Sequence, residues 1–182
     1  MNTIDLFAGC GGFRNGMESA GFSTVFANDI DPRSQRTYEV NTPNIKFECG
    51  SLVDIDPNEL PDFDCLTGGF PCQPFSVSGK GLGFEDTRGT LFFNIAEILR
   101  VKRPQMFLLE NVKQLYHHDS GRTFKRILEV LQDDLGYNVH YEVLNTLDYG
   151  LPQNRQRVFI VGFREQTDFR FPDKVEMRHP FK

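Results

Sequence analysis

The chain alternates short apolar runs with segments of helical period, which predicts an α/β domain around a mainly parallel sheet. Seven runs have the length and residue types of buried strands, namely residues 3–7, 24–28, 45–48, 64–67, 105–110, 139–144 and 157–163. Two segments between them place apolar side chains on one helical face. These side chains are Leu91, Ile95, Ile98 and Leu99 in the first segment, and Phe124, Ile127, Leu128, Leu131 and Leu135 in the second.

The last two predicted strands are separated only by residues 145–156, too few for a comfortable helical crossover. We therefore expect an antiparallel pair at that edge of the sheet. After Phe163 the sequence has no periodicity long enough for a helix. We expect one domain over residues 1–163, followed over residues 164–182 by a linker or the truncated start of a further part.

Composition is that of a soluble protein. With 182 residues, 39% of them hydrophobic, one domain can bury a core without metals or disulfides. No apolar run approaches the about 18 residues of a membrane span, and the first residues lack a signal peptide, so we expect a cytoplasmic location and no membrane partner. The four cysteines form no CxxC pair, which predicts reduced thiols and no metal site.

The net charge of −5 argues against a nonspecific nucleic-acid binder. The charge is unevenly distributed, because acidic residues dominate the first 64 residues and basic residues dominate residues 155–182. Two interpretations stay open: an ordinary fluctuation on a solvated surface, and a phosphate-facing side that begins near Arg155.

One cysteine stands on a turn braced by glycine and proline, in the segment Gly68-Gly69-Phe70-Pro71-Cys72-Gln73-Pro74-Phe75-Ser76. Glu110 follows later at the end of a predicted strand, which delivers it to the carboxyl edge of the sheet, where such folds bind ligands. A thiol and a carboxylate in this order suggest covalent catalysis on a weak electrophile. The structural alternatives are a small buried Cys72 and a Glu110 that caps a helix or lies on the surface.

A glycine-rich loop, Asp5-Leu6-Phe7-Ala8-Gly9-Cys10-Gly11-Gly12-Phe13, follows the first predicted strand. Its glycines allow a tight turn and close approach of a ligand to backbone amides, although dinucleotide-binding domains use a similar loop. Asp29 ends the second strand, where a carboxylate can accept from both hydroxyls of a ribose. Asp31 precedes Pro32 and is predicted to cap the next helix.

The segment around Cys72 resembles the nucleophile loop of the cytosine-5 DNA methyltransferases, and the glycine-rich loop resembles their DLFAGxGG cofactor loop. A third segment, Pro152-Gln153-Asn154-Arg155-Gln156-Arg157, resembles their QxRxR element. The resemblance extends from residue 3 to about residue 163. It implies a doubly wound, mainly parallel seven-stranded sheet of the S-adenosylmethionine-dependent methyltransferase type, with an antiparallel edge strand, in a protein of the restriction-modification type.

By this resemblance, Cys72 attacks carbon 6 of a flipped-out cytosine in double-stranded DNA. Glu110 holds or supplies a proton at ring nitrogen 3, and carbon 5 then takes the methyl group of S-adenosylmethionine. Arg157 contacts the cytosine 2-oxygen, and Arg155 supports the site or the nearby backbone. The alternative for the arginines is an exposed pair that opens an edge strand. No residue identifies itself as the base that removes the carbon-5 proton, and a water molecule is one candidate.

The implied cofactor-binding residues are Phe7, Ala8, Gly9, Gly11, Gly12, Asp29, Ile30, Ser51, Leu52, Pro71 and Leu91. Ser51 departs from the family pattern, which places an acid at this position near the adenine amino group. A hydroxyl accepts a hydrogen bond more weakly than a carboxylate does. We therefore expect a weaker adenine contact at Ser51.

The implied DNA-binding residues are Gln73, Ser76, Ser78, Lys80 and Arg88. In the family this segment is a mobile loop that closes over DNA when the target base leaves the stack, with Ser78 and Lys80 as candidates for gap filling and phosphate contact. The alternative is a flexible, solvated loop. We interpret His117-His118-Asp119 as a surface loop, because adjacent histidines point in different directions and no third metal ligand is near.

The family's DNA enzymes continue with a target-recognition domain and closing motifs, neither of which is recognisable after Phe163. Three hypotheses follow. The chain is the catalytic half of a methyltransferase, cut from a longer protein or paired with a second polypeptide; it is a non-catalytic S-adenosylmethionine-binding remnant; or it is an RNA-directed relative.

Overall fold

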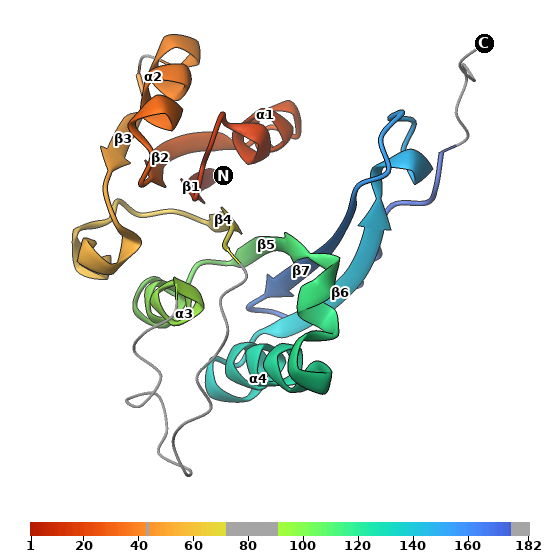
Figure 1. Cartoon of the computed structure of the whole chain (residues 1–182). Coiled ribbons are helices and arrows are strands. Elements are labelled where there is room, and N and C mark those ends of the chain that lie inside the picture. Colours follow the sequence, from red (N-terminus) through yellow and green to blue (C-terminus); the bar gives the residue numbers. More distant parts are fainter. Residues whose placement is uncertain (43, 72–90, 176–182) are drawn as a thin grey trace.

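A computed structural model describes residues 1–42, 44–71 and 91–175 (Figure 1). Its centre is a seven-stranded sheet in the order β3-β2-β1-β4-β5-β7-β6. The strands are β1 (Asn2–Leu6), β2 (Ser23–Asp29), β3 (Lys46–Cys49), β4 (Cys65–Gly69), β5 (Met106–Val112), β6 (Asn138–Asn145) and β7 (Gln156–Phe163). All the predicted strands are confirmed, with bounds that differ by one or two residues.

Strands β1 to β5 are parallel, whereas β7 runs antiparallel to both of its neighbours, β5 and β6. The expected antiparallel pairing at one edge of the sheet is confirmed. The strand of opposite direction is not the outermost one, because β7 lies between β5 and β6. The start of β7 is therefore at the carboxyl edge of the parallel strands.

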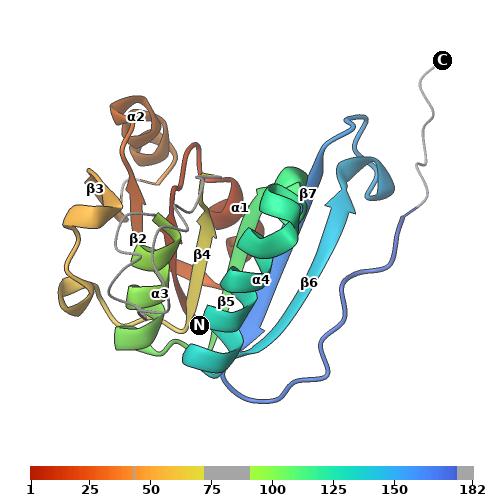
Figure 2. The same ribbon diagram turned by 60° about the horizontal axis from the view of Figure 1, so that its bottom comes forward.

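Helices cover both faces of the sheet (Figures 1 and 2). Helices α1 (Gly12–Ser19) and α2 (Pro32–Asn41) lie on one face, and α3 (Leu91–Lys102) and α4 (Arg122–Glu129) lie on the other. A π-helical turn, Val130–Asp134, continues α4. The two predicted apolar faces are confirmed, since Ile95, Ile98, Leu99, Phe124, Ile127, Leu131 and Leu135 are all buried.

The core under α3 and α4 depends on a glycine in β7. Phe107 of β5 pairs with Gly162, and its ring lies directly over that residue. A Cβ at position 162 would stand 2.2 Å from two ring carbons of Phe107. Only glycine leaves room for this fully buried ring.

Residues 164–175 run along the outer side of β6 (Figure 2). The ring of Phe169 packs against those of His140 and Phe163, with centroids 5.4 and 5.3 Å away. Further on, the amide of Val175 donates to the carbonyl of Asp148 at 2.8 Å. The segment predicted as a linker thus contacts the sheet edge, and the domain boundary at residue 163 stays a prediction. Within the described residues, no helix has the length and hydropathy of a membrane span.

Candidate active site

The loops after the parallel strands meet the beginning of β7 at one edge of the sheet. Leu6 pairs with Asn28 of β2 and with Gly68 of β4. Gly69 pairs with Glu110 of β5. Because β7 is antiparallel, the residues before it also reach this edge. Segments that are far apart in the sequence therefore line one site, in the position where open α/β sheets bind ligands.

The glycine-rich loop turns sharply after β1. Phe7, Gly9 and Gly11 all have positive φ angles, and Gly11 caps the amino end of α1. A Cβ on Gly11 would lie 3.1 Å from Arg14 Nε and 3.2 Å from a ring carbon of Tyr38. Glycine at position 11 therefore serves both the left-handed turn and the close packing beneath it.

Asp29, at the end of β2, hydrogen-bonds to two loops of the site. Its Oδ2 accepts from the amide of Gly9 at 2.8 Å, and its Oδ1 accepts from the amide of Asp31 at 2.9 Å. Each carboxylate oxygen keeps a lone pair for a further donor. Beside it, Ile30 is 71% exposed, which leaves an apolar side chain at the rim of the site.

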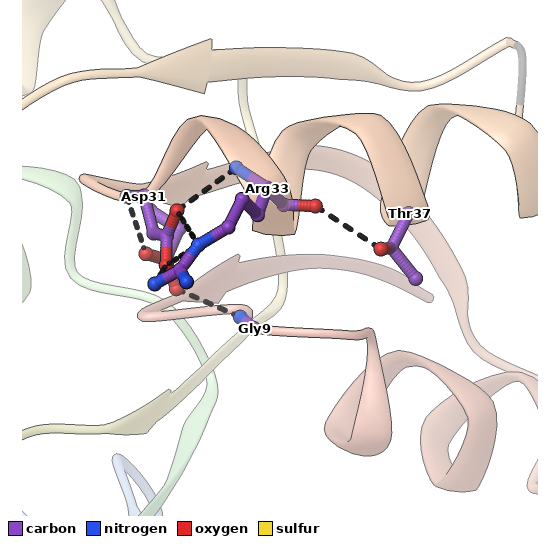
Figure 3. A network of polar contacts seen from close by, with 5 residues as sticks. Gly9, Asp31, Arg33 and Thr37 are labelled. Atoms are coloured by element: carbon purple, nitrogen blue, oxygen red, sulfur yellow. Dashed lines mark hydrogen bonds and ion pairs between the residues drawn. The ribbon is translucent and has the colours of Figure 1, made fainter.

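The predicted cap of α2 is confirmed. Asp31 Oδ1 accepts from the amide of Arg33 at 2.9 Å, and Pro32 occupies the first turn. The Arg33 guanidinium also pairs with this carboxylate and holds its pKa below the usual range (Figure 3). Asp31 is thus occupied by helix capping, whereas Asp29 faces the glycine-rich loop.

The segment after β3 is fixed by the buried amide of Asn28, which donates to the carbonyls of Glu48 and Gly50 at 2.9 and 3.0 Å. Ser51 then caps a 3₁₀ turn, Leu52–Asp54, by accepting from the amide of Val53 at 3.3 Å. Leu52 is buried. Of the predicted cofactor residues here, Ser51 therefore has part of its accepting capacity in use.

Glu110 lies on β5 and meets both predicted arginines. Its Oε1 is 2.8 Å from Arg157 Nε and 3.5 Å from Arg155 Nη2. Arg157 pairs in register with Val112, so it is the diagonal neighbour of Glu110 on the same face of β5 and β7. The Glu110 side chain is 19% exposed, and that of Arg155 46%. The structure thus brings together three of the four predicted catalytic residues.

Asn111 has a positional role that sequence reasoning did not assign. Its buried side-chain amide donates to the carbonyl of Phe70 at 2.8 Å, and its Oδ1 accepts from the amide of Val112 at 2.8 Å. This bond fixes the chain two residues before Cys72. The feature of the sequence that could have indicated this role is the polar Asn111 at a position that alternates with the apolar residues Phe107 and Leu109.

A buried polar cluster lies beneath the glycine-rich loop. Asp5 of β1 is fully buried, and its Oδ1 accepts from the Thr67 hydroxyl at 3.0 Å. Among the described residues, Asp5 Oδ2, Arg14 Nε and the Tyr38 hydroxyl have no hydrogen-bond partner. Burial raises the pKa of Asp5 to about 7, and the bond from Thr67 only partly opposes this rise. The sequence places Asp5 in the first predicted strand and at the start of the glycine-rich loop, and it does not predict burial with a raised pKa.

The remaining predicted residues divide into two groups. Cys72 and the predicted DNA-binding residues Gln73, Ser76, Ser78, Lys80 and Arg88 lie outside the described residues. Pro71 is exposed at the last described position before them, and Leu91 is the first residue of α3. Another cysteine, Cys65, is buried in β4, and burial raises the pKa of its thiol to about 12, which makes it a poor nucleophile.

Of the histidine pair predicted as a surface loop, His117 lies between two short 3₁₀ turns, Lys113–Tyr116 and His118–Gly121, and His118 begins the second turn. His118 Nδ1 is 2.7 Å from the Thr123 hydroxyl. Asp119 forms an ion pair with Arg122. No group of three metal-ligating side chains occurs in the part of the chain that the structure describes.

Comparison with known proteins decides the family. A family model described as C-5 cytosine-specific DNA methylase matches residues 1–181. The chain belongs to this family. The matched range includes the glycine-rich loop, Glu110 on β5, and Arg155 and Arg157 at the start of β7.

Curated relatives agree with this membership. The chain is 56% identical to the type II methyltransferase M.NgoBI of Neisseria gonorrhoeae, over 98% of the chain and 55% of the relative. It is 46% identical to M.HhaI of Haemophilus parahaemolyticus, over 96% of the chain and 53% of the relative. The chain thus spans about half the length of the curated relatives it matches.

Solved structures show the same architecture. A putative DNA modification methyltransferase from an Escherichia coli prophage matches with a TM-score of 0.73 and 26% identity, over 90% of this chain and 46% of that one. DNMT2 of Spodoptera frugiperda has a TM-score of 0.73 at 23% identity, over 96% of this chain and 53% of that one, and shows the fold alone. The predicted methyltransferase sheet is confirmed.

Proposed function

We propose that this chain is the catalytic part of a type II DNA (cytosine-5-)-methyltransferase. It transfers a methyl group from S-adenosylmethionine to carbon 5 of a flipped-out cytosine in double-stranded DNA. The observation that carries the proposal is the position of Glu110, paired with Arg157 at the carboxyl edge of the sheet. The neighbouring strand β4 leads directly from that edge to Cys72.

In the proposed reaction, the Cys72 thiolate forms a bond to carbon 6 while Glu110 holds a proton at ring nitrogen 3. Arg157 supplies a donor at the cytosine 2-oxygen, Arg155 supports the site or the nearby backbone, and both guanidinium groups favour the thiolate. S-adenosylmethionine, when bound, supplies an electrophilic methyl group to carbon 5. The carbon-5 proton then leaves to a base, and the electron pair of that bond expels Cys72 and restores the ring.

The residues at the ends of β1 and β2 fit S-adenosylmethionine. Asp29 has lone pairs left for ribose hydroxyls, and the exposed side chain of Ile30 offers an apolar surface to an adenine ring. The positive φ angles at Gly9 and Gly11 let a ligand approach the backbone closely. Ser51 can still accept one hydrogen bond from the adenine amino group.

Target choice is proposed to come from outside residues 1–163, which form the catalytic and cofactor-binding domain. The relatives named above are about twice as long as this chain. Residues 164–182 would lead into the part that reads DNA, supplied by the same chain or by a second polypeptide. A soluble, cytoplasmic enzyme without a metal ion fits this activity.

The test uses duplex DNA in which the target cytosine is 5-fluorocytosine, so that the carbon-5 position cannot lose a proton. The chain is mixed with this DNA and S-adenosylmethionine, with and without the C-terminal half of M.NgoBI, and covalent adducts are separated on a denaturing gel. We expect an adduct from the reconstituted protein and none from its Cys72→Ser variant. Glu110→Gln should slow adduct formation about 10²- to 10⁴-fold.

Glu142→Gln, at an exposed position on edge strand β6, is the matched control and should leave the rate unchanged. If the reconstituted protein forms no adduct, or if Cys72→Ser forms it equally well, the proposed mechanism is wrong.

A further inference from the structure

A basic hollow of about 390 Å³ lies beside Glu110, between the end of β5 and the start of β7. Its lining residues are Arg155 and Arg157 together with Lys113, Gln114, Gln153, Asn154 and Gln156. Among the described residues, the lining contains three cationic residues, four amide residues and no carboxylate, so the hollow is suited to an anion. The proposed reaction assigns roles to the two arginines only and leaves Lys113 and the amides without one.

The charges in this region are unbalanced. Glu110 already accepts from both arginines through Oε1. Lys113 Nζ donates to the neutral Gln156 Oε1 at 2.9 Å, and no carboxylate of the described residues lies within ion-pair distance of it. The Lys113 ammonium would form a stronger hydrogen bond with a phosphate oxygen than with this amide oxygen, because both partners would then be charged.

The position of Lys113 relates it to the target base. It is the first residue after β5, three residues beyond Glu110 and next to Val112, which pairs with Arg157. In the proposed reaction the cytosine ring lies against Glu110, so the phosphates of the same nucleotide lie only one sugar away. Lysine, arginine and side-chain amides are the usual ligands of DNA phosphates.

We propose that Lys113 binds a phosphodiester oxygen of the target nucleotide, exchanging its bond to Gln156 for one to the phosphate. Gln153 and Asn154 line the same hollow, and their side-chain amides are neutral groups that can donate to a phosphate oxygen. This inference rests on the proposed function, since it requires the flipped nucleotide to lie at Glu110. It adds to that function a contact that positions the target nucleotide.

The test compares Lys113→Met with Lys125→Met, a matched change on α4. The Lys125 side chain is 79% exposed, and its Nζ lies 3.7 Å from Glu129 Oε1. Binding of a fluorescent duplex carrying 5-fluorocytosine is measured by anisotropy at several salt concentrations, with the reconstituted protein in the Cys72→Ser background so that no adduct forms. Thermal unfolding verifies that each variant is folded.

We expect Lys113→Met to weaken DNA binding several-fold at low salt. The magnitude of the slope of the logarithm of the association constant against the logarithm of the salt concentration should fall by about 0.9, the value for one lost phosphate contact. Lys113→Arg should restore most of the slope, because it keeps the charge. Lys125→Met should match the parent protein. If Lys113 had only a structural role, Lys113→Met would lower the thermal stability without changing the salt dependence of DNA binding.

Equal salt slopes for Lys113→Met and Lys125→Met would overturn the inference, as would a parent protein that binds no DNA at low salt. A different result would contradict the proposed function without contradicting the phosphate contact. If the reconstituted protein with Cys72 intact forms no adduct while Lys113→Met still reduces the salt slope, the phosphate contact stands and the covalent chemistry does not.

Discussion

Glu110 presents its two carboxylate oxygens to different neighbours. Oε1 accepts from the arginines, whereas Oε2 lies on the side of Gly69, where an added Cβ would stand 3.4 Å away. In the proposed reaction, a cytosine at the carboxyl ends of β4 and β5 meets Oε2, and the guanidinium groups hold the carboxylate from the other side. Glycine at position 69 keeps that approach open.

Because of Asp5, in the buried cluster beneath the glycine-rich loop, the stability of the fold depends on pH. Its pKa is raised from 3.8 to about 7 in the folded chain, so between these values the native state binds more protons than the unfolded state. The contribution of Asp5 to stability is therefore fully favourable at low pH and falls as pH rises from about 4 to 7. The total change is roughly 4 kcal/mol in the free energy of unfolding.

We predict that Asp5→Asn removes this pH dependence while keeping an acceptor for Thr67. Urea unfolding of both proteins at pH 5 and pH 8 measures the effect. Relative to the parent chain, Asp5→Asn should gain stability at pH 8 and less at pH 5. A stability difference between the two proteins that is the same at both pH values would contradict a raised pKa at Asp5.

At the scale of elements, the position of β7 between β5 and β6 decides how the site is built. Its direction brings Arg155 and Arg157 to the edge where the parallel strands end, beside Glu110. Its glycine at position 162 admits the buried Phe107 ring, which fixes β5 against α3 and α4. The same strand therefore serves both the core and the site.

We predict that Gly162→Ala destabilises the chain by about 3 kcal/mol, because the new methyl group would overlap the Phe107 ring and force β5 or the ring to move. Thermal unfolding followed by circular dichroism measures the loss. Gly16→Ala is the matched control: Gly16 lies inside α1 with no atom within 4 Å of the added Cβ, so this change should stabilise by about 0.5–1 kcal/mol. Equal melting temperatures for Gly162→Ala and the parent chain would contradict the packing at β7.

In the molecule as a whole, the described residues leave one side of the proposed cofactor site exposed. Ile30, beside Asp29, is 71% exposed. A ligand at this edge would leave part of its surface in water. An open site of this kind buries less of its ligand than the 70–90% that is typical of small-molecule pockets.

We predict that the chain alone binds S-adenosylmethionine weakly, and that adding the C-terminal half of M.NgoBI tightens the binding. Isothermal titration of the cofactor into each sample provides the comparison. Asp29→Ala should weaken binding in both samples, because the ribose would lose its acceptor. Tight binding by the lone chain, unchanged by the added half, would show that residues 1–182 already complete the site.

Much of the fold could be predicted from local pattern. The strands were found within one or two residues because each is a short apolar run bounded by turn-forming residues, and the cap at Asp31 follows from an acid placed directly before Pro32. The roles of Asn111 and Lys113 could not be predicted in this way. Their partners, Phe70 and Gln156, lie about forty residues away along the chain.

The strands, the residues available for chemistry and the resemblance to the family follow from local residue types and their order in the sequence. The tertiary structure adds that β7 lies between β5 and β6, that Glu110 meets Arg155 and Arg157, and that Asp5 is buried deeply enough for its pKa to rise. The physical reason is that strand order, cross-strand register and burial arise from contacts between distant segments. Local pattern predicts pairing where a short connection joins two strands, as for β6 and β7, but it does not say which distant segments meet.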